Sequence, residues 1–341
     1  MVRLIQLAVG LALLTTPGDL ARSAQQSPAG WRDPSSHRVR FVTVDSSVRL
    51  EVLNWGSSGS PVVLLGCYLT AHVYDDFAPK LANQFRVFAI TRRGIGASDK
   101  PATGYSVQRS ADDVREVLES LKLERAVLVA TSCGGQILNP LASQRPDLVG
   151  GLVYLNGAED PTLTSIDYDP PLPDVTKLPP SIKPAPVPDY RSFEAYRTAQ
   201  RRDHGVAFPE SELRQLFVAN PDGSMGRSLL SLVVRKAITE DARVKPDYSH
   251  VRVPVLAIFS APRTFADLDR DSPSRNEQDR AILSQQYLAE RAMVSRWERD
   301  LLTGVPTARI VELAGANLYM FLSNEADVLR EVRTFAGAVS P

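Results

Sequence analysis

Residues 126–135 read AVLVATSCGG, a run of apolar residues that ends in a serine, a cysteine and a pair of glycines. The apolar part is typical of a buried strand, and the glycines break it. A serine at a strand-to-helix turn can stand above a sheet as a nucleophile, provided that the residues two before and two after it are small. Ala130 and Gly134 hold those positions. Ser132 is therefore the candidate nucleophile, and the alternative is a serine that only completes a tight turn.

Short apolar runs of the same kind recur on both sides of this stretch. Continuous runs indicate strands buried on both faces of a mostly parallel sheet, and helical patterns alternate with them. One such helix covers 107–121, with Ser110 and Asp113 as its capping box. Two alternating segments, 38–44 and 48–55, predict an antiparallel pair. The sequence thus predicts an α/β fold with a doubly wound, mostly parallel sheet. The continuous runs are 62–65, 87–90, 126–130, 152–155, 255–259 and 310–311.

The alternation stops between residues 160 and 250. Residues 161–190 contain nine prolines, and each proline removes a backbone donor and fixes φ. We expect an inserted helical, proline-rich lid over 160–250, with helices at 190–202, 211–218 and 225–238. A long amphipathic helix from about 276 to 302 is expected to follow it.

The first residues predict export from the cell. One positive charge at Arg3 precedes an apolar run that is too short to span a bilayer, and small residues follow near Ala24. We interpret residues 1–24 as a signal peptide, 25–37 as a loose leader and 38–341 as one domain that contains the lid. The alternative is an uncleaved lipophilic anchor.

Charge and motif content exclude several classes of partner. Lysine plus arginine and aspartate plus glutamate both number 39, and the charges are interspersed, so no basic surface for nucleic acid is predicted. No later segment is long and apolar enough for a transmembrane span. The sequence has no metal-ligand or complete dinucleotide motif, so we predict no metal and no cofactor. The pair Arg92-Arg93 is expected to anchor its loop, and the oligomeric state stays open.

The order of these motifs resembles the α/β-hydrolase superfamily, in particular its lidded esterase and epoxide-hydrolase-like branch. The resemblance covers roughly residues 38–337 and rests on the arginine–glycine loop at 91–98, the Ser132 turn, the strand at 253–258 and the tail segment 315–317. It implies a sheet of the α/β-hydrolase type and the chemistry of a serine hydrolase. In such relatives a histidine stands where this chain has Leu318.

Two of the three positions of a catalytic triad are changed. A serine hydroxyl needs a base to accept its proton and a carboxylate to orient that base. Leu318 cannot accept a proton, and Asn156 stands where relatives often carry an aspartate. His72 and His204 are possible substitute bases, whereas the two other histidines, at 37 and 250, are expected at the surface. Asp267 is a possible acid, as are the acidic residues at 159, 160 and 269.

The resemblance also assigns an oxyanion hole, which needs two backbone amides aimed at the developing charge. The matching residues are Cys67 and Cys133, and Tyr68 follows where relatives are often glycine-rich. Two amides that converge on one oxygen bring their Cα atoms close, so the cysteines could form a disulfide. The alternative is two separate thiols.

Two functions remain open from the sequence. The first is a catalytically degraded hydrolase that binds a small apolar molecule in a lidded pocket, or turns it over very slowly. The second is an active hydrolase of ester- or lactone-type substrates that uses His72 or His204 as an unusual base.

Overall fold

A computed structural model describes residues 31–339, apart from 57, 174–189, 263 and 267–275, and of residues 203 and 204 it describes only the backbone. The predicted signal peptide and residues 25–30 of the leader lie outside these residues. The chain builds an eight-stranded sheet in the order β1-β2-β4-β3-β5-β6-β9-β10. Its strands are β1 (Arg38–Val44), β2 (Val48–Asn54), β3 (Pro61–Leu65), β4 (Arg86–Ile90), β5 (Ala126–Thr131), β6 (Val149–Leu155), β9 (Val255–Ala261) and β10 (Arg309–Ala314).

The sheet is mostly parallel, as the continuous apolar runs predicted. β1 and β2 pair antiparallel, β2 joins β4 antiparallel, and every other neighbouring pair is parallel. Each predicted strand is present with small shifts at its ends. Since parallel strands end at the same edge, residues that follow β5, β6 and β10 gather on one side of the molecule.

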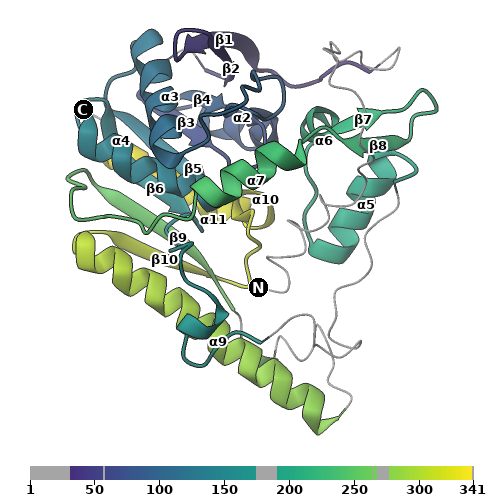
Figure 1. The fold of residues 1–341 in the computed structure, drawn as a ribbon, viewed down its shortest axis with the longest axis vertical. Helices are drawn as coiled ribbons and strands as arrows, with labels where there is room; N and C mark the ends of the chain where they lie inside the picture. Colours follow the sequence, from purple (N-terminus) through teal and green to yellow (C-terminus); the bar gives the residue numbers. More distant parts are fainter. Residues whose placement is uncertain (1–30, 57, 174–189, 263, 267–275, 340–341) are drawn as a thin grey trace.

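Helices cover both faces of the sheet (Figure 1), which confirms the doubly wound arrangement. Strand β5 shows why both faces need cover, because Leu128 and Ala130 belong to one apolar core whereas Val127 and Val129 belong to the other. The first core is closed by α3 (Val107–Ser120), α4 (Leu138–Gln144) and α9 (Glu277–Gly304). The second is closed by η1 (Ala71–Tyr74), α2 (Ala78–Leu81), α10 (Met320–Ser323) and α11 (Glu325–Val339).

The capping box expected at the start of α3 is wrong by one turn. Ser106 caps the helix instead, and its Oγ accepts a hydrogen bond from the backbone N of Arg109 at 3.1 Å. Ser110 and Asp113 lie inside the first turns, where both are buried. By contrast, Asn276 caps α9 close to the expected start, since its Oδ1 accepts from the Asp279 backbone N at 2.8 Å.

The segment between β6 and β9 holds η3 (Ser165–Asp167), α5 (Phe193–His204), α6 (Glu210–Leu216), β7 (Phe217–Ala219), β8 (Met225–Ser228) and α7 (Leu232–Asp241). The helix expected over 225–238 is wrong in its first part, because β7 and β8 form an antiparallel pair. The turn between them contains Pro221, Asp222 and Gly223, and Gly223 has a φ of +84°. Such residues favour a turn. Along the described part of the chain, no helix combines enough length with enough apolar character to cross a membrane.

Candidate functional site

Ser132 stands at a sharp turn between β5 and the short helix η2 (Ser132–Ile137). Its φ is +51°, a conformation that only tight packing imposes on a residue with a Cβ. Glycines allow that packing. A Cβ built on Gly135 would lie 1.9 Å from the carbonyl O of Gly157, and one on Gly134 would lie 3.1 Å from the carbonyl O of Gly66. The partly exposed Ser132 therefore sits where a nucleophile is presented above the sheet.

A disulfide joins Cys67 and Cys133, the two residues expected to supply the oxyanion-hole amides. Their Cα atoms are 5.2 Å apart, and the bond spans 66 residues of sequence. Cys67 belongs to a small apolar cluster whose other members come from the loop after β4 and from α7 with the loop before it: Ile95, Tyr105, Leu230, Val234 and Ile238. The loop after β3 is thus covalently tied to the residue that follows Ser132. Of the two states that the sequence left open for these cysteines, the structure has the bridge.

Tyr68, where relatives are expected to have a glycine, places a large side chain against α7. Its Oη lies 2.7 Å from Oγ1 of Thr239 on α7, and the guanidinium of Arg235 lies 5.9 Å from the ring centroid. These contacts tie the loop after β3 to the segment inserted between β6 and β9.

Asn156 directly follows β6, and its side chain bonds to the backbone of a neighbouring strand instead of to a base. Its φ is +49°, and its Oδ1 accepts a hydrogen bond from the backbone N of Ser260 at 2.7 Å. Its Nδ2 is buried and has no hydrogen-bond partner in the structure. A buried donor without an acceptor is costly.

Leu318 follows β10, in the loop that leads into α10. Ser260 Oγ donates to the carbonyl O of Ala316 at 2.5 Å, so the Asn156 side chain and this loop are both anchored on Ser260. The Leu318 side chain is partly buried and packs against the core that contains Tyr319 and Phe321. Ser132, Asn156 and Leu318, the positions that the resemblance assigns to a triad, therefore follow β5, β6 and β10 at one edge of the sheet, and the side chains of Asn156 and Leu318 have no acid–base chemistry.

A family model described as alpha/beta hydrolase fold matches residues 60–204, from β3 through the Ser132 turn to α5. The chain belongs to the α/β-hydrolase superfamily. It is 32% identical over 126 residues to epoxide hydrolase 1 of Caenorhabditis elegans, an alignment that covers 34% of this chain and 30% of that protein. It is 31% identical over 122 residues to 2-(acetamidomethylene)succinate hydrolase of Mesorhizobium japonicum, which covers 36% of this chain and 44% of that protein. The chain thus aligns with less than half the length of these curated relatives.

Solved α/β-hydrolase structures share the fold over most of the chain. The structure of E-2-(acetamidomethylene)succinate hydrolase has a TM-score of 0.59 at 22% identity and covers 88% of this chain and 98% of its own. A serine hydrolase involved in carbazole degradation has a TM-score of 0.60 at 15% identity and covers 89% and 99%. At such identities the likeness concerns the fold alone.

Among the described side chains of this hydrolase-superfamily chain, no histidine or carboxylate forms a hydrogen bond with Ser132 Oγ. Of the predicted substitute bases, His204 ends α5 and its side chain is not described, and the possible acids Asp267 and Asp269 fall outside the described residues. Asp160 is engaged locally, since its Oδ1 accepts from the backbone N of Thr162 at 2.9 Å. Burial raises the pKa of Glu159, the remaining candidate acid, to about 7.

His72 is engaged elsewhere. Its Nε2 faces Glu51 Oε1 at 3.4 Å, and its Nδ1 faces Asp75 Oδ2 at 3.2 Å. Burial alone would lower the pKa of His72, but hydrogen bonds to three carboxylates outweigh it and raise the pKa to about 12. An imidazolium carries a proton on each nitrogen, so this His72 cannot accept one from a serine.

The expectation that His37 lies at the surface is wrong. Only 5% of its side chain is exposed, and its Nδ1 lies 2.7 Å from Asp75 Oδ1. The ring packs edge-on against those of His72 and Trp55, with centroids 4.9 and 5.6 Å away. His250, in contrast, is exposed as expected.

The structure thus reveals a cluster that motif reading missed, in which Asp33, His37, His72 and Asp75 converge. Each histidine has an aspartate three or four residues away, but the two pairs lie in separate segments. Those spacings are the only sequence signal, and nothing in the sequence shows that the pairs meet.

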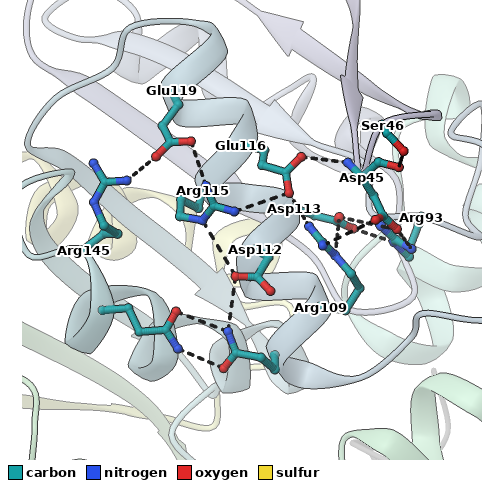
Figure 2. A network of polar contacts seen from close by, with 12 residues as sticks. Asp45, Ser46, Arg93, Arg109, Asp112, Asp113, Arg115, Glu116, Glu119 and Arg145 are labelled. Atoms are coloured by element: carbon teal, nitrogen blue, oxygen red, sulfur yellow. Dashed lines mark hydrogen bonds and ion pairs between the residues drawn. The ribbon is translucent and has the colours of Figure 1, made fainter.

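The prediction that the Arg92-Arg93 pair anchors its loop is confirmed, and Figure 2 shows the contacts of Arg93. Arg93 Nε and Nη2 donate to the two oxygens of Asp113, each at 2.6 Å, and Nη2 also reaches Asp45 Oδ2 at 3.3 Å. Arg92 Nη2 donates to Ser110 Oγ at 2.9 Å. These bonds tie the loop after β4 to α3 and to the turn between β1 and β2.

Proposed function

We propose that this chain is a catalytically degraded α/β hydrolase that binds a small apolar molecule and turns it over very slowly, if at all. The observation that carries the proposal is the pairing of an intact turn at Ser132 with an aliphatic side chain, Leu318, at the position of the general base. The alignments with named hydrolases support the ancestry. Among the described side chains, none forms an acid–base pair with Ser132, which argues against ordinary turnover.

The role of the base determines how much catalytic rate is lost without it. Without a base the serine hydroxyl stays protonated at neutral pH, and an amide such as Asn156 has no charge to stabilise an imidazolium. In a well-studied serine protease, loss of the histidine lowers turnover about a millionfold, which is about 8 kcal/mol of barrier. No described group near Ser132 is placed to restore that amount.

Binding does not require the missing groups. The disulfide holds the loop after β3 next to Cys133, so two backbone amides can still face a carbonyl or another hydrogen-bond acceptor. Apolar side chains of α7 pack with Cys67, and Leu318 adds aliphatic surface in a second apolar cluster. We therefore assign an apolar ligand with one polar acceptor, and we assign the inserted segment 160–250 as its lid.

The disulfide also supports export of the protein. Structural disulfides persist in oxidising compartments and are rare in the cytosol. We propose that the N-terminal segment directs the chain to the periplasm or the medium. Recovery of the chain in those fractions with residues 1–24 removed would support this, and a cytosolic location with the segment intact would contradict it.

A fluorophosphonate probe tests the proposal directly. We expect no labelling of Ser132 above the background of a Ser132→Ala variant, and no hydrolysis of short acyl esters above that same background. Rapid labelling at Ser132 would instead support the alternative of an active hydrolase, with His204 as the remaining candidate base.

Restoring the triad tests whether only the acid–base pair is missing. In the double variant Leu318→His, Asn156→Asp we expect ester hydrolysis to rise about 100-fold or more, which is the range of general acid–base catalysis. Leu322→His is the matched control, because Leu322 is also a partly buried leucine of the same core. Adding Ser132→Ala to the double variant must abolish the gain.

A further inference from the structure

We propose that Asp33, His37, His72 and Asp75 form a binding site for one Zn²⁺ ion. The four residues come from the segment before β1 and from η1 with the residue that follows it. None of them belongs to the Ser132 turn, so the site is independent of the function proposed above.

The spacing of the ligand atoms fits a four-coordinate ion. Each residue offers one nitrogen or carboxylate oxygen, and these four atoms all lie within 4.8 Å of one another. A tetrahedral zinc ion with bonds of about 2.0–2.2 Å separates its ligand atoms by about 3.4 Å. His72 Nδ1 lies 3.2 Å from Asp75 Oδ2 and 3.5 Å from Asp33 Oδ2. The shorter His37 Nδ1 to Asp75 Oδ1 distance, 2.7 Å, is a hydrogen bond that the ion would replace.

The residues around the four ligands are arranged as they are around metal-binding histidines. A ligating histidine usually gives its second ring N–H to a carboxylate, which fixes the ring and its tautomer. His72 Nε2 faces Glu51 Oε1 at 3.4 Å, and Thr91 Oγ1 donates to the other Glu51 oxygen at 2.8 Å. Asp75 is fixed in turn by Ser211 Oγ, which donates to its Oδ2 at 2.6 Å.

Burial and charge favour a cation. The side chains of His37, His72 and Asp75 are 5%, 4% and 3% exposed, whereas Asp33 is 27% exposed and gives the site an opening to solvent. Three carboxylates, including Glu51, face the two imidazoles, and Zn²⁺ would displace the ring proton on the ligating nitrogen of His72 to solvent as it binds. A divalent ion would offset most of that negative charge. Two nitrogens with two carboxylates suit zinc, whereas Ca²⁺ and Mg²⁺ require mainly oxygen ligands.

A bound ion would connect three segments of the fold. It would bridge the segment before β1 and η1, and through the Ser211 hydrogen bond to Asp75 it would also fix α6 in the inserted segment. Its effect is therefore expected on stability and not on chemistry at Ser132.

Chelator-treated protein with its disulfide intact should be titrated with ZnCl₂ by calorimetry and with CoCl₂ by visible absorption. We expect one equivalent of Zn²⁺, and the strong visible bands of tetrahedral cobalt. With free Zn²⁺ at 100 times its dissociation constant, the unfolding midpoint should rise by about 4 °C. A metal-free ion-pair cluster would show no saturable binding and no midpoint shift, which would overturn the proposal.

Two mild variants separate a metal site from a set of hydrogen bonds. His37→Gln can still donate an N–H to Asp75, and Asp33→Asn changes the most exposed ligand, so both should fold. Each should weaken Zn²⁺ binding at least tenfold. The exposed pair His250 and Asp247, with Nδ1 and Oδ2 3.7 Å apart, supplies the matched controls His250→Gln and Asp247→Asn. Undiminished affinity in His37→Gln and Asp33→Asn would place the ion elsewhere and refute the proposal.

Discussion

The Ser132 turn and the histidine–aspartate cluster differ in their ionisable side chains: the turn has few, and the cluster has four. At the turn, Leu318 and Asn156 stand where the resemblance to α/β hydrolases would place a base and an acid, and the backbone turn at Ser132 is formed. In the cluster, two histidines and two aspartates are packed together, and none of them belongs to the turn. The comparison teaches that the Ser132 turn does not depend on charged side chains, because backbone packing and a disulfide hold it.

The two regions also differ in how they are held together. The turn depends on close backbone contacts between glycines and on the covalent link between Cys67 and Cys133. The cluster depends on charge balance among groups from distant segments. Substitutions can test this contrast one contribution at a time.

The largest effect is expected for Gly135→Ala. A Cβ at this position would lie 1.9 Å from the Gly157 carbonyl O, so the backbone must move. We expect a loss of stability on the order of 5 kcal/mol, enough to prevent folding. Gly337→Ala in α11 is the control, because a Cβ there meets no described atom within 4 Å, and it should be neutral or slightly stabilising. Circular dichroism and soluble yield measure both, and a normally folded Gly135→Ala protein would contradict the packing argument.

Removal of the disulfide should have the next largest effect. A bridge that spans 66 residues restricts the unfolded chain, and its loss should lower the free energy of unfolding by about 4 kcal/mol. Guanidinium unfolding of Cys67→Ala, Cys133→Ala against oxidised protein measures this loss. Reduced wild type should match the double variant. If all three proteins unfolded at the same midpoint, the bridge would not be what holds the turn.

The buried Glu212, which interacts with the charges of His72 and Asp75, should make the stability of the protein depend on pH. Glu212 is fully buried, and burial raises its pKa to about 8. The negative charge of Asp75 raises the pKa further, whereas hydrogen bonds from Thr70 and the charge of His72 lower it. The unfolded carboxyl ionises near 4.5, so folding takes up a proton between pH 4.5 and 8. This group alone therefore lowers stability as pH rises, by about 3 kcal/mol from pH 5 to 7.

Glu212→Gln should remove that component and keep both contacts with Thr70. Urea unfolding at pH 5, 6 and 7 should show a flatter pH dependence in Glu212→Gln than in wild type. Glu212→Ala is the control: it should be equally flat but less stable, since it leaves the Thr70 N–H without its acceptor. Parallel curves for wild type and Glu212→Gln would contradict the assigned cause.

The sequence predicted features that local pattern determines. Buried strands such as Leu152–Leu155 were predictable because continuous apolar runs fit a sheet covered on both faces. The turn at Ser132 was predictable because its small neighbours are adjacent in sequence. Ser106 was missed as the cap of α3 because Ser110 and Asp113 match the same capping pattern, and only the fold assigns them to Arg92 and Arg93.

Features that depend on distant segments were not predictable. His37 looked like a surface residue because it lies in a polar leader, and its burial depends on contacts with Trp55 and His72. The strand β8 was mistaken for the start of a helix because its short sequence has no distinctive period. Whether Cys67 and Cys133 bridge required the distance between their Cα atoms.

The smallest effect is expected at the nucleophile position itself. Ser132 has a φ of +51°, which costs a residue with a Cβ about 1 kcal/mol relative to glycine. Ser132→Gly should therefore stabilise the protein by about 1 kcal/mol, measured by chemical unfolding, whereas Ser132→Ala keeps the Cβ and should gain nothing from the backbone. This strain is expected whatever residue with a Cβ stands at position 132, because the contacts of Gly134 and Gly135 impose the turn. Equal stability of Ser132→Gly and Ser132→Ala would show that the turn is relaxed, and the contrast between a strained turn and a charge-balanced cluster would then fail.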